Sequence, residues 1–368
     1  MQAKTSQKQI HNCPTVAVET DPEQVARSAG LKYVSDNVPG IQRKRVGRGF
    51  RYINVDRQPI KQSQQLKRIK ALVIPPSWQE VWICPFSNGH LQATGRDAKG
   101  RKQYRYHSKW QEVRNRTKFD RMIIFGHKLP AIRQATDRDL RSPNLSRERI
   151  LATVVRLLED TLIRIGNAEY AKKNKSFGLT TLRNSHVEVT TTKVRFQFRG
   201  KSGVEHEVEL SDRRLARVIK RCQEIPGQEL FQYLDQEGNP QAIDSADVNA
   251  YLQEITGEEF TAKDFRTWAG TANTAWALAN LETPTTKKQT QTNIREAVKQ
   301  VASQLGNRVA TCRKYYIHPA IVQAYEEGWL LPMLKAEQEK FANHEVGELD
   351  LQPEELALLA VLEHHSTN

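Results

Sequence analysis

The segment LGNRVATCRKYYIHP, residues 305–319, is the most informative part of this sequence. Within it, Tyr316 lies nine residues after Asn307, and Arg313 and Lys314 come just before the tyrosine pair. A phenol that attacks a phosphodiester needs cations nearby. Its unperturbed pKa is about 10, and neighbouring cations stabilise its anion. A tyrosine on a basic helix is, however, more often an ordinary half-buried aromatic. The other segments decide between these two interpretations.

The composition limits the class of protein. The chain has 368 residues, of which 38% are hydrophobic and 27% charged, enough for about two domains. No apolar run approaches the roughly 18 residues of a membrane span, and no signal-peptide core follows Met1, so we expect a cytoplasmic protein. Its cysteines form no CxxC pair, so we expect neither a zinc module nor disulfides. They are Cys13, Cys84, Cys222 and Cys312.

The charge is unevenly distributed along the chain. The net charge is +14, but residues 336–368 carry eight acidic residues and one basic residue. That segment therefore has a net charge of −7, and residues 1–335 have +21. Such a field attracts a polyanion such as DNA and makes binding sensitive to salt. A solvated basic surface kept for solubility rarely needs so much charge.

The texture of the sequence predicts an α+β protein in four parts. Residues 1–30 are a polar leader, and residues 31–112 form a small β-rich domain with strands at 50–55, 80–84 and 90–95 and a helix at 67–72. Residues 113–335 form a larger, mainly helical domain. Residues 336–368 are an acidic tail, with a helix that begins at Pro353.

Two elements stand out in the helical half. Residues 149–165 carry apolar residues at helical spacing, which predicts a helix with one buried face. Residues 187–210 alternate apolar and polar side chains on both sides of GKSG, residues 200–203, which predicts a β-hairpin. The GKS of this turn looks like the end of a phosphate-binding P-loop, but Arg195 stands where that motif needs a glycine, and the turn leads into a strand. Lys201 is then either a solvated turn lysine or a cation held rigidly toward a phosphate or a leaving oxygen.

Two arginines lie in unusual surroundings. Arg164 sits among apolar residues at the end of the predicted helix, where a charge is costly unless an anion meets it; Asp160 is the structural alternative. Arg266 follows Thr261 and Asp264, which can cap a helix. An arginine near a helix start more often pairs with a carboxylate than with a substrate.

The segment from 95 to 107, GRDAKGRKQYRYH, interleaves cations with two tyrosines. Tyr104 and Tyr106 are at strand spacing, so both rings face one side, with Arg96 and Lys102 close by. This arrangement suits contact with the sugars, bases and phosphates of DNA. A basic edge strand whose rings cover a small core is an equally good interpretation of this segment alone.

Taken in order, these segments resemble the type IB DNA topoisomerases, in particular the compact bacterial and poxvirus form. The likeness runs from about Lys32 to His318 and includes GFRY at 49–52, GLTTLRNSH at 178–186 and the hairpin after it. The resemblance implies a tyrosine recombinase/topoisomerase IB-like fold with a DNA-clamping N-terminal domain. It also implies an enzyme that cuts one DNA strand, lets it swivel and reseals it.

The resemblance assigns a role to each candidate residue. Tyr316 would attack the backbone and form a 3′-phosphotyrosyl bond, while Arg164 and Arg266 clamp the scissile phosphate. Lys201 would protonate the departing 5′-oxygen. Asn307 replaces the histidine of the viral and eukaryotic pattern, so it can donate a hydrogen bond but cannot titrate. The residues expected to contact DNA outside the reacting centre are Arg96, Lys102, Tyr104, Tyr106 and Lys263.

This chemistry conserves bond energy, so we expect no ATP, no metal and no other cofactor. The expected partner is double-stranded DNA, clamped by a monomer in the nucleoid. The nearest alternative is a tyrosine recombinase, which usually has a histidine where this chain has Lys263 and lacks the 95–107 segment. A non-catalytic DNA-binding protein would explain the charge, but not the ordered residues Arg164, Lys201, Arg266 and Tyr316.

Overall fold

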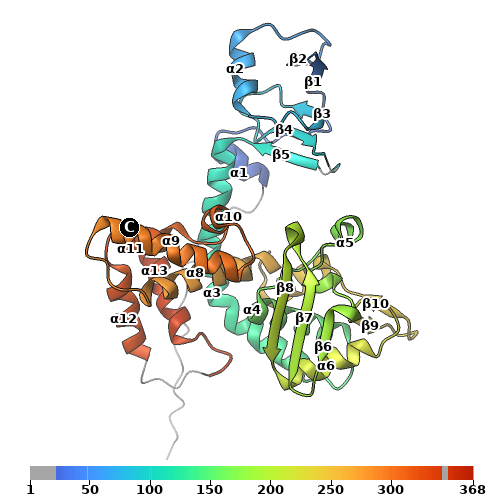
Figure 1. The fold of residues 1–368 in the computed structure, drawn as a ribbon, viewed down its shortest axis with the longest axis vertical. Helices are drawn as coiled ribbons and strands as arrows, with labels where there is room; N and C mark the ends of the chain where they lie inside the picture. Colours follow the sequence, from blue (N-terminus) through green and yellow to red (C-terminus); the bar gives the residue numbers. More distant parts are fainter. Residues whose placement is uncertain (1–21, 48, 99, 101, 342–346, 368) are drawn as a thin grey trace, which may run out of the picture. The chain divides into compact units, whose positions relative to one another are not determined.

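The computed structural model describes residues 22–47, 49–98, 100, 102–341 and 347–367 (Figure 1). The chain divides into two units, residues 1–120 and 121–368. We predicted a boundary at residue 112, whereas the division falls within one long helix, α3 (Ser108–Leu140). The pattern of short apolar runs gives way to helical spacing near the start of this helix, so the predicted boundary falls before the observed division.

The first unit is built on a five-stranded antiparallel sheet with strand order β2-β1-β3-β4-β5. Its buried core includes Ile41, Ile69 and Ile83. The predicted strands and helix are present within a few residues, but the first strand was not anticipated, because only its first residue is buried and no alternation shows. The elements are α1 (Pro22–Ser28), β1 (Ile41–Val46), β2 (Gly49–Ile53), α2 (Ser63–Ala71), β3 (Gln79–Ile83), β4 (Leu91–Arg96) and β5 (Lys102–Tyr106).

The second unit is mainly helical and carries a three-stranded antiparallel sheet, β6-β7-β8, and a small hairpin, β9-β10. The α+β class predicted from the sequence is therefore confirmed. Its helices are α4 (Arg147–Thr161), α5 (Ala168–Asn174), α6 (Arg213–Gln223), α7 (Ser245–Thr256), α8 (Ala262–Ala279), α9 (Lys287–Gln304), α10 (Val309–Tyr315), α11 (Pro319–Glu326), α12 (Leu330–Phe341) and α13 (Pro353–Thr367). Its strands are β6 (Val187–Val189), β7 (Lys193–Arg199), β8 (Glu205–Ser211), β9 (Gln232–Leu234) and β10 (Pro240–Ala242).

The β7–β8 hairpin follows the predicted alternation. Val194, Phe196 and Phe198 of β7 are buried, and the residues between them are exposed. The strands pair in register from Lys193 with Ser211 to Arg199 with Glu205, so residues 200–204 form the turn. The side chains that alternate inward pack on the core of the second unit and hold the hairpin against it.

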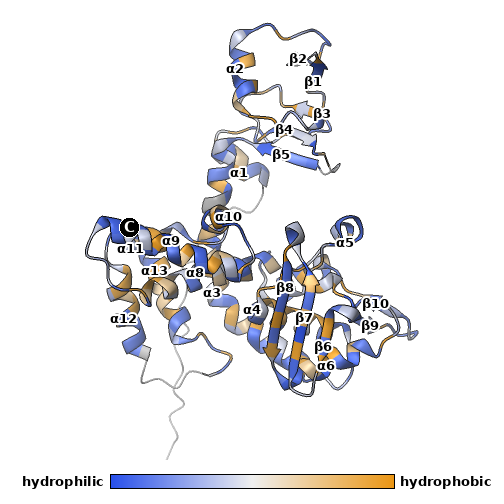
Figure 2. Ribbon diagram, in the orientation of Figure 1, coloured by the Kyte–Doolittle hydropathy of each residue, from blue (hydrophilic) through white to orange (hydrophobic). Residues whose placement is uncertain are grey.

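We predicted an acidic tail with a helix that begins at Pro353; this helix is present as α13, and it belongs to the core of the second unit. Its apolar residues Leu358 and Leu362 are at most 1% exposed, and the helix shows apolar residues along much of its length (Figure 2). Two acids, Glu354 and Glu355, lie in its first turn, where Glu355 forms an ion pair of 2.7 Å with Arg133 on α3. Arg133 also pairs with Glu159 on α4 at 2.7 Å. Arg133 thus ties three helices together.

Loss of this buried ion-pair network should destabilise the protein. Burial works to lower the pKa of Arg133, but Glu355 and Glu159 outweigh it and raise that pKa. Arg133→Ala removes the cation that two largely buried carboxylates share and leaves Glu159 only its longer ion pair of 3.4 Å with Arg156, so it should reduce the free energy of unfolding by about 3–5 kcal/mol. Arg138→Ala, on the same helix but with a side chain 72% exposed, should cost less than about 1 kcal/mol. Equal losses in chemical denaturation would contradict this role of Arg133.

Cys84, Cys222 and Cys312 are free and buried, and Cys13 lies outside the described residues, as does most of the predicted leader. None of the helices described is both long enough and apolar enough to cross a membrane.

Candidate active site

Arg164 lies just beyond α4, not on it. The helix ends at Thr161, because Leu162 adopts a left-handed conformation (φ 56°, ψ 17°) and turns the chain away. We predicted a helix to residue 165, so this part of the prediction is wrong. Arg164 Nη2 donates hydrogen bonds to the Gly306 carbonyl at 2.9 Å and to Asn307 Oδ1 at 2.5 Å. The end of α4 therefore brings Arg164 to the Gly306–Asn307 turn.

Arg266 lies in α8 and is only 4% exposed. Its helix begins with the predicted capping box of Thr261 and Asp264. Arg266 Nη1 donates to the Leu162 carbonyl and Nη2 donates to the Leu305 carbonyl at 2.7 Å. The hydrogen bonds described for Arg164 and Arg266 thus end on neutral oxygens, and neither Asp160 nor another carboxylate takes the role of the structural alternative.

Tyr316 follows the last residue of α10 as its C-cap. Its N–H donates to the Cys312 carbonyl at 2.9 Å, and its carbonyl lies so close to α8 that a Cβ on Gly270 would be 2.4 Å from it. The ring centroid lies 5.3 Å from the Arg266 guanidinium carbon. Glycine at 270 therefore permits α8 to approach the tyrosine, and this approach places the phenol beside Arg266.

Two buried donors at this site have no hydrogen-bond partner among the described residues. They are Arg266 Nε and Asn307 Nδ2. The bond from Arg164 to Asn307 Oδ1 orients the amide and leaves its NH₂ group as the unused end. A buried donor left unsatisfied costs about 1–3 kcal/mol. Donors of this kind, next to two guanidiniums, are suited to bind the oxygens of an anion.

The electrostatics of the site also favour an anion. Burial, followed by the charge of Arg164, lowers the pKa of Arg266 to about 10. Burial likewise lowers the pKa of Arg164. Both shifts mean that the cations lack enough negative charge around them, so a bound phosphate would raise these pKa values again. Cys312 is also part of this region, and burial raises the pKa of its thiol to about 11.

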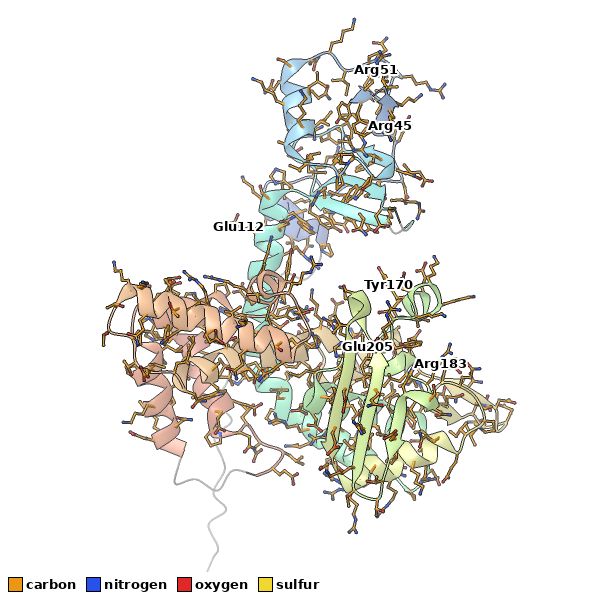
Figure 3. All side chains as sticks on the ribbon, viewed as in Figure 1. Arg45, Arg51, Glu112, Tyr170, Arg183 and Glu205 are labelled. Atoms are coloured by element: carbon orange, nitrogen blue, oxygen red, sulfur yellow. The ribbon has the colours of Figure 1, made fainter. Side chains whose placement is uncertain are left out.

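Lys201 is exposed in the turn between β7 and β8, as predicted. Ser202 and Gly203 have positive φ angles of 65° and 78°, and the Gly200 N–H donates to the Val204 carbonyl at 2.7 Å. The tight turn therefore places Lys201 at the tip of a hairpin that is anchored in the core. Glu205, labelled in Figure 3, begins the returning strand.

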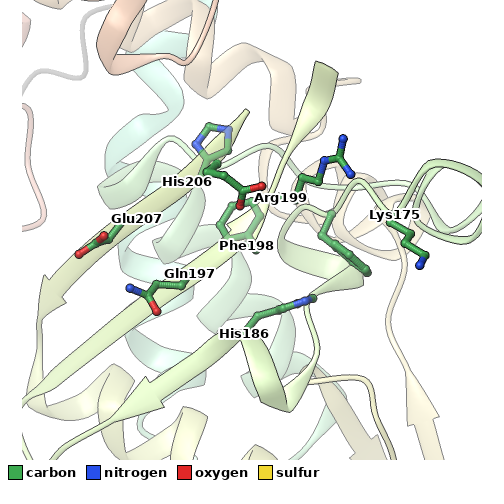
Figure 4. A pocket seen from close by; sticks show the side chains of 9 residues that line it. Lys175, His186, Gln197, Phe198, Arg199, His206 and Glu207 are labelled. Atoms are coloured by element: carbon green, nitrogen blue, oxygen red, sulfur yellow. The ribbon is translucent and has the colours of Figure 1, made fainter. Parts of the chain in front are cut away.

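His206, near this turn, was given no functional role from the sequence. It alternates inward on β8, and burial together with the charges of Arg164 and Arg266 lowers the pKa of its imidazole. A histidine among the apolar inward positions of a hairpin was the available signal. His206 also lines a pocket at the end of the sheet with Phe198, Arg199 and Lys175 (Figure 4).

The predicted DNA-contacting residues divide between the two units. In the first unit, the Tyr104 and Tyr106 rings stack on one face of β5 with centroids 6.0 Å apart and are 46% and 39% exposed. Lys102 pairs with Asp36 at 2.7 Å, and Arg96 pairs with Glu80 at 2.8 Å. In the second unit, the fifth candidate, Lys263, is exposed in the first turn of α8.

The second unit brings together four of the five predicted catalytic residues through bonds and ring contacts, namely Arg164, Arg266, Asn307 and Tyr316, and holds Lys201 on an anchored turn. Within the described ranges, no three His, Cys, Asp or Glu side chains are grouped as a metal ion would require.

Comparisons with known proteins show the family of this chain. Residues 107–344 match the family model of the eukaryotic DNA topoisomerase I catalytic core, and residues 49–97 match that of the bacterial DNA topoisomerase IB N-terminal domain. The DNA topoisomerase 1B of Acanthamoeba polyphaga mimivirus is 33% identical over 294 residues, which cover 78% of this chain and 88% of the relative. The DNA topoisomerase 1B of vaccinia virus (strain Copenhagen) is 28% identical over 137 residues, 37% of this chain and 41% of that protein. This chain belongs to the type IB DNA topoisomerases.

Proposed function

We propose that this topoisomerase relaxes supercoiled DNA through a covalent 3′-phosphotyrosyl intermediate at Tyr316. The observation that carries the proposal is the pair of buried donors without a partner among the described residues, Arg266 Nε and Asn307 Nδ2, with the Tyr316 ring beside the Arg266 guanidinium. A phosphate bound there would take up both donors and lie beside the tyrosine. These two donors are the strongest indication that the site binds an anion.

The chemistry consists of two balanced transesterifications. The Tyr316 oxygen forms a bond to phosphorus as its proton passes to solvent water, and the bond from phosphorus to the 5′-oxygen breaks. Lys201 gives a proton to that 5′-oxygen, which departs as a hydroxyl. Resealing reverses both changes after the free strand has swivelled. Because the phosphotyrosyl bond conserves the energy of the broken bond, the cycle needs no ATP.

The arginines and Asn307 stabilise the charge that builds on the non-bridging oxygens in the transition state. Arg164 and Arg266 are positively charged at neutral pH and are held by carbonyl groups, so little reorganisation is needed when the phosphate arrives. Asn307 adds a neutral donor and takes no part in proton transfer. These cations supply the electrostatic stabilisation that a metal ion provides in other phosphoryl-transfer enzymes.

Duplex DNA is the proposed partner of both units. In the first unit, the stacked rings of Tyr104 and Tyr106 and the exposed cations of the β1–β2 hairpin, such as Arg45 and Arg51 (Figure 3), suit the sugar-phosphate backbone. In the second unit, Lys263 lies three residues before Arg266 on α8. We infer that one chain acts as a monomer on each duplex, in the cytoplasm with the chromosomal DNA.

Relaxation should proceed without metal or nucleotide. The purified protein should relax both negatively and positively supercoiled plasmid in EDTA, because swivelling is driven by the torsion stored in the DNA. Activity should fall steeply with salt as contacts with phosphates weaken. Agarose gels of plasmid topoisomers measure both effects.

Two outcomes would contradict the proposal. An absolute requirement for Mg²⁺ or ATP would rule out this chemistry. Recombination between two specific sites with little relaxation elsewhere would favour a tyrosine recombinase. The presence of Lys263 in place of the histidine that recombinases usually have would then need another explanation.

A further inference from the structure

His206 lies on the inner side of the β7–β8 hairpin, close to its turn. It pairs in register with Phe198 on the neighbouring strand, and the two rings stack with centroids 5.1 Å apart and an interplanar angle of 12° (Figure 4). Stacking on Phe198 therefore fixes the orientation of the His206 ring. One face of the ring is covered by Phe198, and the ring edges carry the contacts with other parts of the site.

The edges of this ring meet two glycines that precede catalytic candidates. A Cβ on Gly200 would lie 2.4 Å from His206 Cδ2, and a Cβ on Gly306 would lie 2.8 Å from Cε1. Gly200 precedes Lys201, and Gly306 precedes Asn307. The imidazole therefore packs between the lysine turn and the Gly306–Asn307 turn, with no room for a side chain on either glycine.

The backbone at Gly200 shows that the ring itself imposes the glycine. Its angles of φ −95° and ψ −162° are open to any residue, so no turn geometry requires a glycine there. At Gly306 a positive φ of 56° adds a second reason for glycine. The contact between Gly200 and His206 is therefore specific and can be tested by substitution.

The charges around the ring favour its neutral form. Burial lowers the pKa of His206, the cations of Arg164 and Arg266 lower it further, and only Glu205 opposes them. A neutral imidazole can pack between the two turns, whereas an imidazolium would add a third positive charge beside the two guanidiniums.

We propose that His206 is a positioning residue. Its ring packs between the Lys201 turn and the Gly306–Asn307 turn and fixes their separation, so that Lys201 and the phosphate-binding donors contact the same phosphate. This inference rests on the proposed role of Lys201 in the reaction. His206 itself touches neither DNA nor the reacting atoms in this assignment. It acts by setting the position of the lysine.

The first experiment is a double-mutant cycle of His206→Ala and Lys201→Ala, read as the single-turnover cleavage rate of a duplex oligonucleotide. His206→Ala alone should slow cleavage by about 10- to 100-fold, the effect of misplacing a reacting group by about 1 Å. Once Lys201 is alanine, removal of the ring should bring no further slowing. Multiplicative slowing in the double variant would overturn the proposal, whatever the chemical role of Lys201.

A second cycle tests the contact with Gly200. Gly200→Ala should slow cleavage in the wild-type background, because the new methyl group collides with the ring. In the His206→Ala background that methyl group has space, so the same substitution should slow cleavage little or restore part of the rate. Equal slowing in both backgrounds would show that glycine is needed at this position for another reason and would overturn the proposed contact.

A substrate with sulfur in place of the bridging 5′-oxygen separates this inference from the proposed function. Sulfur leaves without a proton, so His206→Ala and Lys201→Ala should both cleave it almost as fast as wild type. If Lys201→Ala is rescued and His206→Ala is not, the positioning proposal fails while the acid role stands. If Lys201→Ala is not rescued, the acid role fails, and the cycle with Lys201 alone decides the positioning proposal.

Val208→Ala is the matched control for loss of packing. Val208 is the next inward-facing residue of β8 and packs on the core of the second unit. This variant and His206→Ala should lower the thermal unfolding midpoint to a similar degree, but only His206→Ala should slow cleavage. A comparable loss of rate in Val208→Ala would show that any loosening of the hairpin has this effect and would overturn a specific role for the ring.

Discussion

Tyr316→Phe should leave no detectable relaxation and no covalent DNA–protein adduct, while DNA affinity changes little. The substitution removes only the oxygen that forms the bond to phosphorus, and it leaves the ring to pack beside Arg266, whose guanidinium carbon is 5.3 Å from the ring centroid. Because no other atom of the residue reacts, the loss should appear in the chemical step and not in binding. Denaturing gels of labelled DNA trapped with detergent measure the adduct, and plasmid gels measure relaxation.

The adjacent tyrosine provides the matched control. Tyr315 is the last residue of α10 and is 39% exposed, whereas Tyr316 has left helical geometry (φ −129°, ψ −3°) and is partly buried. The two side chains therefore leave the chain in different directions, and Tyr315→Phe should keep most of the activity. Reversed phenotypes would show that the nucleophile is Tyr315 and that the site is displaced by one residue.

Lys201→Ala should slow cleavage by about 10²–10⁴-fold, the usual worth of positioned proton transfer. An unprotonated 5′-alkoxide is a very poor leaving group, so the cost falls on the chemical step. DNA affinity should change little, because the lysine is one of many cations on this strongly basic chain. Lys193→Ala is a suitable control: it removes a lysine from the opposite end of the same hairpin, where Lys193 pairs with Glu209 at 2.7 Å, and should cleave near the wild-type rate.

The chemical role of Lys201 is tested by the leaving group. With sulfur at the bridging 5′-position no proton is required, so Lys201→Ala should cleave that substrate almost as fast as wild type. If the variant stays equally slow on sulfur, Lys201 stabilises charge on the phosphate instead of protonating the leaving group. The acid would then have to be sought elsewhere, with Lys263 and Arg164 as the next candidates.

The local elements of this protein could be predicted because their signals are local. Alternation along β7 and β8 identified both strands and the turn that carries Lys201, and Thr261 with Asp264 identified the start of α8. The end of α4 could not be predicted in the same way. The apolar spacing continues to residue 165, and only the left-handed conformation of Leu162, whose carbonyl accepts a bond from Arg266, ends the helix earlier.

The sequence by itself determined the identity and order of the candidate residues, since the spacing around Tyr316, the basic tyrosine strand and the GKS turn are all readable along the chain. The tertiary structure alone decided which parts of the chain these residues contact. Arg164 reaches Asn307 across 143 positions and leaves Nδ2 free for an anion, His206 packs between Gly200 and Gly306, and α13 enters the core. Such contacts depend on which buried faces meet when the chain collapses, and an apolar face can be recognised in a sequence without its partner being specified.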